Sequence, residues 1–181
     1  MQRLKALEPD QAHPSAGQLL GDIVQRHGDA GATVRAMANS PALLQGYLDL
    51  SRATKRIKIP RALAEKISLA VQEWIGCPRC LAAHSDAARA AGLSDTDIEL
   101  ARQGTSVDGR EAVLVALAVR LLVEPSTIDD ADVASVREHG WSDRVLADLA
   151  DLVALVALNQ LTGSFNLLAG LGVESVETQV T

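Results

Sequence analysis

The sequence is poor in aromatic residues, which occupy only 2% of its 181 positions. The four aromatic residues are Tyr47, Trp74, Trp141 and Phe165. Proteins that bind single-stranded nucleic acid stack successive bases on exposed aromatic rings, and too few rings are present here for such a platform. Alanine, leucine and valine must therefore fill the core, because 48% of the residues are hydrophobic. This composition suits closely packed helices.

The sequence also lacks an excess of positive charge and long apolar runs. Its formal net charge is −6 and no basic stripe is present, so we do not expect a nucleic acid as partner. The longest apolar runs, 113–119 and 152–158, are far shorter than the ~20 residues of a membrane-spanning helix. No secretory signal is visible over residues 1–17. We expect a cytoplasmic protein that does not bind a membrane.

The sequence pattern predicts an all-α protein, because no segment combines sustained alternation with β-branched residues. Helix-start and helix-stop residues divide the chain. We expect a loose N-terminal segment, 1–14, followed by a single all-helical domain, 15–181. The first sixty residues should hold three helices. Later helices are expected over 61–75, after the N-caps Cys77, Ser94 and Asp108, over 130–138, and over 142–169 with a break near Gly163.

The two cysteines lie three positions apart, in Cys77-Pro78-Arg79-Cys80. Pro78 cannot continue the preceding helix, because its ring would clash with the turn before it and it has no N–H. Gly76 permits a change of direction, and Pro78 suits the first position of a new helix with Cys77 as its N-cap. The positive end of the helix dipole and Arg79 both favour a thiolate there. So close a pair indicates redox or metal chemistry in a reducing compartment.

His84 adds a proton acceptor to the same helix. It follows Cys80 by four residues and Cys77 by seven, so at about 100° per residue all three side chains project from one face. A histidine there can accept or return a proton at a cysteine. Two other interpretations stay open on the residues alone. The cysteines could be small buried hydrophobes, or the three side chains could bind zinc with Glu65 or a residue of another subunit as fourth ligand.

Residues 65–84 resemble the motif of a known family. The pattern is Glu65, eleven residues, Cys77-x-x-Cys80, three residues and His84, and it is followed by alanine-rich sequence and Gly92-Leu93-Ser94. It is similar to the alkylhydroperoxidase D-like family of the carboxymuconolactone decarboxylase superfamily. The resemblance implies a homo-oligomeric, all-helical thiol peroxidase that needs no bound cofactor. Its partners would be a hydroperoxide substrate and a dithiol reductant, such as dihydrolipoamide or a small redox protein.

The resemblance also implies a role for each residue of the motif. Peroxide would oxidise Cys80 to a sulfenic acid, and Cys77 would resolve it to a disulfide, while His84 and Glu65 would form a proton relay. In the best-known branch a histidine lies between the cysteines, where this sequence has Arg79, so that part of the relay is missing. Helix-cap chemistry alone favours the thiolate at Cys77, but His84 is one turn from Cys80 and better placed as its base.

The choice of Glu65 rests on the spacing of the family motif. Glu65 points away from the apolar stripe of its helix, where a glutamate is normally solvated. Glu73 is a rival for the relay because it lies four residues before Cys77. The predicted buried stripe consists of Leu63, Ile67, Ala70, Val71 and Trp74.

Two other functions stay open at this point. The chain could be a redox sensor or interaction protein whose disulfide alters assembly without catalysis. It could also be a decarboxylase-like member of the same superfamily, in which a redox pair would have no use.

Overall fold

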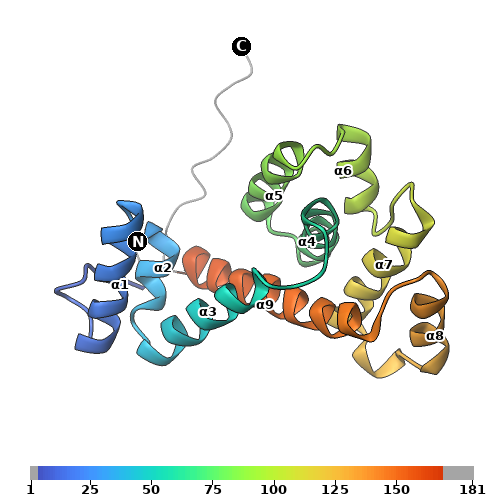
Figure 1. Ribbon diagram of the computed structural model, residues 1–181. Helices are drawn as coiled ribbons and strands as arrows, with labels where there is room; N and C mark the ends of the chain where they lie inside the picture. Colours follow the sequence, from blue (N-terminus) through green and yellow to red (C-terminus); the bar gives the residue numbers. More distant parts are fainter. Residues whose placement is uncertain (1–3, 169–181) are drawn as a thin grey trace, which may run out of the picture. The chain divides into compact units, whose positions relative to one another are not determined.

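The computed structural model describes the backbone of residues 4–168 and the side chains of residues 4–160. Throughout these residues the regular secondary structure is helical, so the prediction of an all-α fold is confirmed (Figure 1). The helices are α1 (Pro14–His27), α2 (Gly31–Met37), α3 (Pro41–Thr54), α4 (Arg61–Ile75), α5 (Pro78–Ala90), α6 (Asp95–Arg102), α7 (Gly109–Val123), the short 3-10 helix η1 (Pro125–Thr127), α8 (Asp130–Glu138) and α9 (Asp143–Leu168).

The helix boundaries follow local signals in the sequence. Ser94 caps α6 in a capping box with Asp97, and Asp108 caps α7 by accepting from the backbone N–H of Arg110. The predicted break at Gly163 is wrong, because α9 runs through that residue to Leu168. A single glycine weakens a helix by about 1 kcal/mol, which is too little to interrupt one of this length.

The chain forms two compact units, and the described residues 4–52 lie in unit 1. The expectation of one domain over 15–181 stays a prediction, since two compact units can fold as one domain. In unit 1, Leu20, Met37 and Leu44 are fully or almost fully buried in a shared apolar cluster. Leu7 packs against this cluster and its N–H donates to the carbonyl of Arg35 at 3.2 Å. The expectation that the segment 1–14 is loose stays a prediction.

Unit 2, Ala53–Gln160, is built around α4. α5, α6 and α7 all pack against α4, and Figure 1 shows α4 between them. Leu63, Ile67 and Val71 on one side of α4 are fully buried in the main core cluster, which also contains residues of α7, α8 and α9. Leu69, on another side, is buried in a second cluster with residues of α5 and α6. The central helix is therefore covered on more sides than its apolar stripe predicts.

Trp74 corrects the predicted stripe of α4. Four of its five residues are buried, but Trp74 is 61% exposed. It lies in the last turn of α4, one residue before the helix ends at Ile75. Its neighbour Ile75 still packs against the main core cluster, so helical phase alone places Trp74 wrongly.

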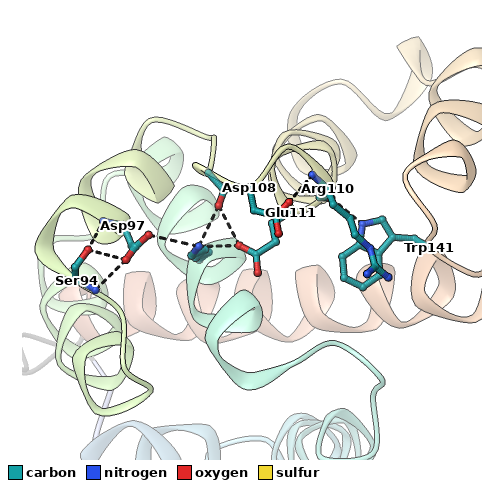
Figure 2. Close-up of polar contacts among 8 residues, drawn as sticks. Ser94, Asp97, Asp108, Arg110, Glu111 and Trp141 are labelled. Carbon is teal, nitrogen blue, oxygen red and sulfur yellow. Dashed lines mark hydrogen bonds and ion pairs between the residues drawn. The ribbon is translucent and has the colours of Figure 1, made fainter.

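A buried lysine joins α4 to α6 and α7. Lys66 is 6% exposed, and its Nζ donates to Glu111 Oε2 at 2.7 Å and to Ser106 Oγ at 3.0 Å. The same Nζ lies 3.7 Å from Asp97 Oδ1. Figure 2 shows Asp97 and Glu111 directed toward this contact from their two helices. A buried ammonium is tolerated only when it is paired, so these contacts fix α4 against its neighbours.

Candidate active site

The turn between α4 and α5 brings the two cysteines to the start of a helix. α4 ends at Ile75 and is followed by its C-cap Gly76, whose φ of +75° lies in the left-handed region that favours glycine. Pro78 then occupies the first position of α5, and Cys77 is the N-cap, as the sequence predicts. Both cysteine residues are half-buried, whereas Pro78 and Arg79 between them are exposed.

Cys77 and Cys80 are joined by a disulfide within the first turn of α5, with their Cα atoms 5.3 Å apart. The backbone N–H of Cys80 also donates to Cys77 Sγ at 3.3 Å. This N–H is one of the donors at a helix start that have no partner within the helix. The helix start therefore supplies a hydrogen bond to a sulfur as well as the positive end of its dipole.

Glu65 of α4 and His84 of α5 form a hydrogen bond across the two helices. His84 Nδ1 lies 2.9 Å from Glu65 Oε2, and the two side chains are 29% and 17% exposed. A carboxylate oxygen accepts hydrogen bonds, so Nδ1 donates and Nε2 of a neutral ring is left as the proton acceptor. A carboxylate that orients an imidazole in this way is a recurring arrangement for a general base.

The geometry separates the two candidate glutamates. Glu65 faces α5, and the side of α4 that the sequence interpretation regards as solvated is covered by that helix. Glu73 instead accepts from Arg102 Nε of α6 at 2.7 Å. Glu65 therefore meets His84, and Glu73 helps to hold α6.

The sequence interpretation misses a buried amide on the same side of α4. Gln72 is only 1% exposed, and its Oε1 has no hydrogen-bond partner among the described residues. The signal was its spacing of seven residues from Glu65, which puts both side chains on one side of a helix.

The remaining histidines have local roles. His13 caps α1 and His27 ends it, while His139 Nδ1 bonds to the carbonyl of Ser135 at 2.7 Å. Over residues 4–160, no group of three or more His, Cys, Asp and Glu side chains is arranged to hold a metal ion. None of the helices in the described part of the chain is long and apolar enough to cross a membrane.

Comparison with protein families supports the resemblance that the motif suggests. Residues 41–120 match the model of the Carboxymuconolactone decarboxylase family. The matched segment runs from the start of α3 to Arg120 of α7 and includes all of residues 65–84. A search of the curated proteins finds no match.

Two solved structures have a similar fold. One is described as the alkylhydroperoxidase AhpD core of an uncharacterized peroxidase-related protein from Ralstonia eutropha JMP134, with a TM-score of 0.73 at 18% identity over 90% of this chain and 89% of that chain. The other is an uncharacterized peroxidase-related protein from Silicibacter sp. TM1040, with a TM-score of 0.72 at 19% identity over 91% of this chain and 89% of that chain. With the family match, they confirm the predicted resemblance to alkylhydroperoxidase D-like proteins. At 18% and 19% identity, the two solved structures by themselves show only that the fold is shared.

Proposed function

We propose that the protein is a thiol-dependent peroxidase that reduces hydroperoxides at Cys80. His84 Nε2 takes the proton of the Cys80 thiol, and the thiolate attacks the terminal oxygen of the hydroperoxide. The O–O bond breaks, Cys80 becomes a sulfenic acid, and the leaving alkoxide takes the proton from His84 to become an alcohol. The Cys77 thiol then attacks the sulfenic sulfur, which forms the disulfide and releases water.

The observation that carries this proposal is the contact of His84 with Glu65 on the helix that begins with the disulfide. His84 lies four residues after Cys80, so its ring projects from the same side of α5 one turn further on. Glu65 orients the ring and stabilises the imidazolium that forms during the proton transfer. All the groups needed for one turnover are thereby held on two packed helices.

Regeneration requires two electrons from outside the chain. A dithiol, such as dihydrolipoamide or a small redox protein with two cysteines, attacks the disulfide and leaves as a disulfide itself, returning both cysteines to thiols. Arg79, exposed between the cysteines, carries a fixed positive charge and cannot act as a second proton shuttle at neutral pH. His84 is therefore the only histidine in this relay.

Peroxide consumption in the presence of a dithiol tests the proposal. We expect the wild-type chain to turn over hydrogen peroxide and an organic hydroperoxide many times. Cys80→Ser should lose at least a hundredfold of this rate, because the nucleophile is removed. The matched variant Cys77→Ser should still consume one equivalent of peroxide in a single turnover.

Two outcomes of the same assay favour other functions. Disulfide formation with peroxide but no turnover with any dithiol would support a redox sensor. Full peroxide consumption by Cys80→Ser would contradict the proposed mechanism. A decarboxylase activity, which the family name suggests, would be unaffected by both cysteine substitutions.

A further inference from the structure

Gln72 is a buried amide with an unused acceptor. Its side chain lies on α4 and is 1% exposed, and its Oε1 has no hydrogen-bond partner among the residues whose side chains are described. A buried acceptor without a donor lowers stability, and such atoms in native proteins often mark a functional group. Within residues 4–160, Gln160 Oε1 on α9 is the other side-chain atom in this state, and it lies outside the α4–α5 pair.

The position of Gln72 directs it toward α5. Gln72 follows Glu65 by seven residues, or about two helical turns, so the two side chains lie about 20° apart around α4. Glu65 reaches His84 on α5. Gln72 therefore faces α5 as well, closer than Glu65 to the bend at Gly76.

The bend at Gly76 determines which residues of α5 lie beside Gln72. Its backbone carbonyl accepts from the N–H of Cys77 at 3.4 Å and from the N–H of Gly76 at 2.9 Å. α5 packs against α4, and His84 meets Glu65, seven residues before Gln72 on α4. Seven residues before His84 on α5 is Cys77, so we infer that the first turn of α5, Cys77 to Cys80, lies at the level of Gln72. Cys80 lies one turn before His84 and so shares its α4-facing side.

We propose that Gln72 binds the hydroperoxide beside Cys80, with its Oε1 accepting a hydrogen bond from the peroxide O–H. This inference rests on the proposed function. The terminal oxygen that Cys80 attacks carries that hydrogen and keeps it when it becomes the sulfenic acid. Gln72 Oε1 can thus hold the same O–H before and after the O–O bond breaks. His84, on α5, accepts the proton of the Cys80 thiol and passes it to the leaving alkoxide. Gln72 and His84 therefore bind different hydrogens.

The test compares two reagents on one cysteine. In a Cys77→Ser background only Cys80 can react, and its rates with hydrogen peroxide and with iodoacetamide are measured by mass spectrometry. Gln72→Met removes the acceptor at similar size. We expect it to slow the reaction with peroxide about tenfold, the loss of about one hydrogen bond, and to leave alkylation within twofold.

The midpoint of thermal unfolding distinguishes a binding role of Gln72 from a structural one. If the Gln72 amide stabilised the fold, Gln72→Met would lower this midpoint. Removing an unpartnered buried acceptor should leave the midpoint of Gln72→Met equal to or above that of the parent. Ser68→Ala is the matched control, because Ser68 is also a buried polar residue of α4 but its Oγ is already bonded to the carbonyl of Ala64 at 2.8 Å. It should leave both rates unchanged. Gln72→Leu replaces the methionine variant if the latter does not fold.

The outcomes separate this inference from the proposed function. Equal losses with peroxide and iodoacetamide, or no loss with peroxide, would overturn the role of Gln72 while leaving the peroxidase proposal intact. A Cys77→Ser parent that does not react with peroxide at all would overturn both.

Discussion

At the scale of single residues, the site depends on which carboxylate meets the imidazole. Two glutamates on α4 have a plausible spacing from the cysteines, and their partners distinguish them. Glu65 contacts His84 Nδ1 at 2.9 Å, whereas Glu73 accepts a hydrogen bond from Arg102. In the proposed mechanism, the Glu65 contact leaves Nε2 of His84 as the ring atom that accepts the thiol proton.

Glu65→Gln tests this pairing. Glutamine has nearly the same size but no negative charge, so it stabilises the imidazolium less. We expect the rate of Cys80 oxidation by peroxide to fall ten- to a hundredfold at pH 7, within the range that general base catalysis supplies. Stopped-flow measurement of the reduced chain across pH 5–9 would show the loss and any change in the pH profile.

Glu73→Gln is the control for that experiment. It removes a carboxylate of the same helix that contacts Arg102 instead of His84, so its rate should stay within twofold of the wild type. A large loss in Glu73→Gln with none in Glu65→Gln would reverse the assignment.

At the scale of helices, some features of the site are determined by local capping signals and others by contacts between residues far apart in the sequence. Gly76, Pro78 and Cys77 fix the turn between α4 and α5 and are readable from the sequence. The burial of Lys66 and Gln72 on α4 cannot be predicted from the local sequence, because it depends on helices that come later in the chain. Lys66 pairs with Glu111, 45 positions further on, and the local sequence pattern does not predict that partner.

The cap of α6 gives a prediction about acid stability. Hydrogen bonds from the side chain and backbone of Ser94 hold the pKa of Asp97 below its ordinary value of 3.8, with a smaller contribution from Lys66. The unfolded chain therefore binds a proton at Asp97 more readily than the folded chain. The resulting stability is present above about pH 4 and is lost as the pH falls through the lowered pKa.

Asp97→Asn should remove this pH-dependent part of the stability. Urea unfolding at pH 7, 4 and 3 should show that the variant is less stable than the wild type at pH 7, by about 1 kcal/mol as for other helix caps, and that the difference shrinks toward pH 3. Ser94→Ala removes the main donor to Asp97 and also the bond that Ser94 Oγ accepts from the Asp97 N–H, so its loss of stability should shrink only in part toward pH 3. A difference that stays constant from pH 7 to pH 3 would contradict this explanation.

At the scale of the whole molecule, composition and helix signals are enough to predict an all-α fold, and the cysteine motif is enough to predict which family model residues 41–120 match. They fail where burial depends on packing between helices. Trp74 has the periodicity of a core residue and is exposed, while Glu65 has the phase of a solvated residue and is half-buried. Both differences depend on which parts of α4 other helices cover, because α5 covers Glu65 whereas Trp74 in the last turn is left exposed.

Trapping the first oxidation product in the whole chain tests the central claim most directly. The reduced Cys77→Ser protein is mixed with one equivalent of hydrogen peroxide and with dimedone, which reacts with sulfenic acids, and the product is mapped by mass spectrometry. Cys80 should carry one dimedone adduct, and the reduced Cys80→Ser protein should carry little or none at Cys77. An adduct that forms readily on Cys77 and not on Cys80 would contradict the assignment of Cys80 as the residue that peroxide attacks.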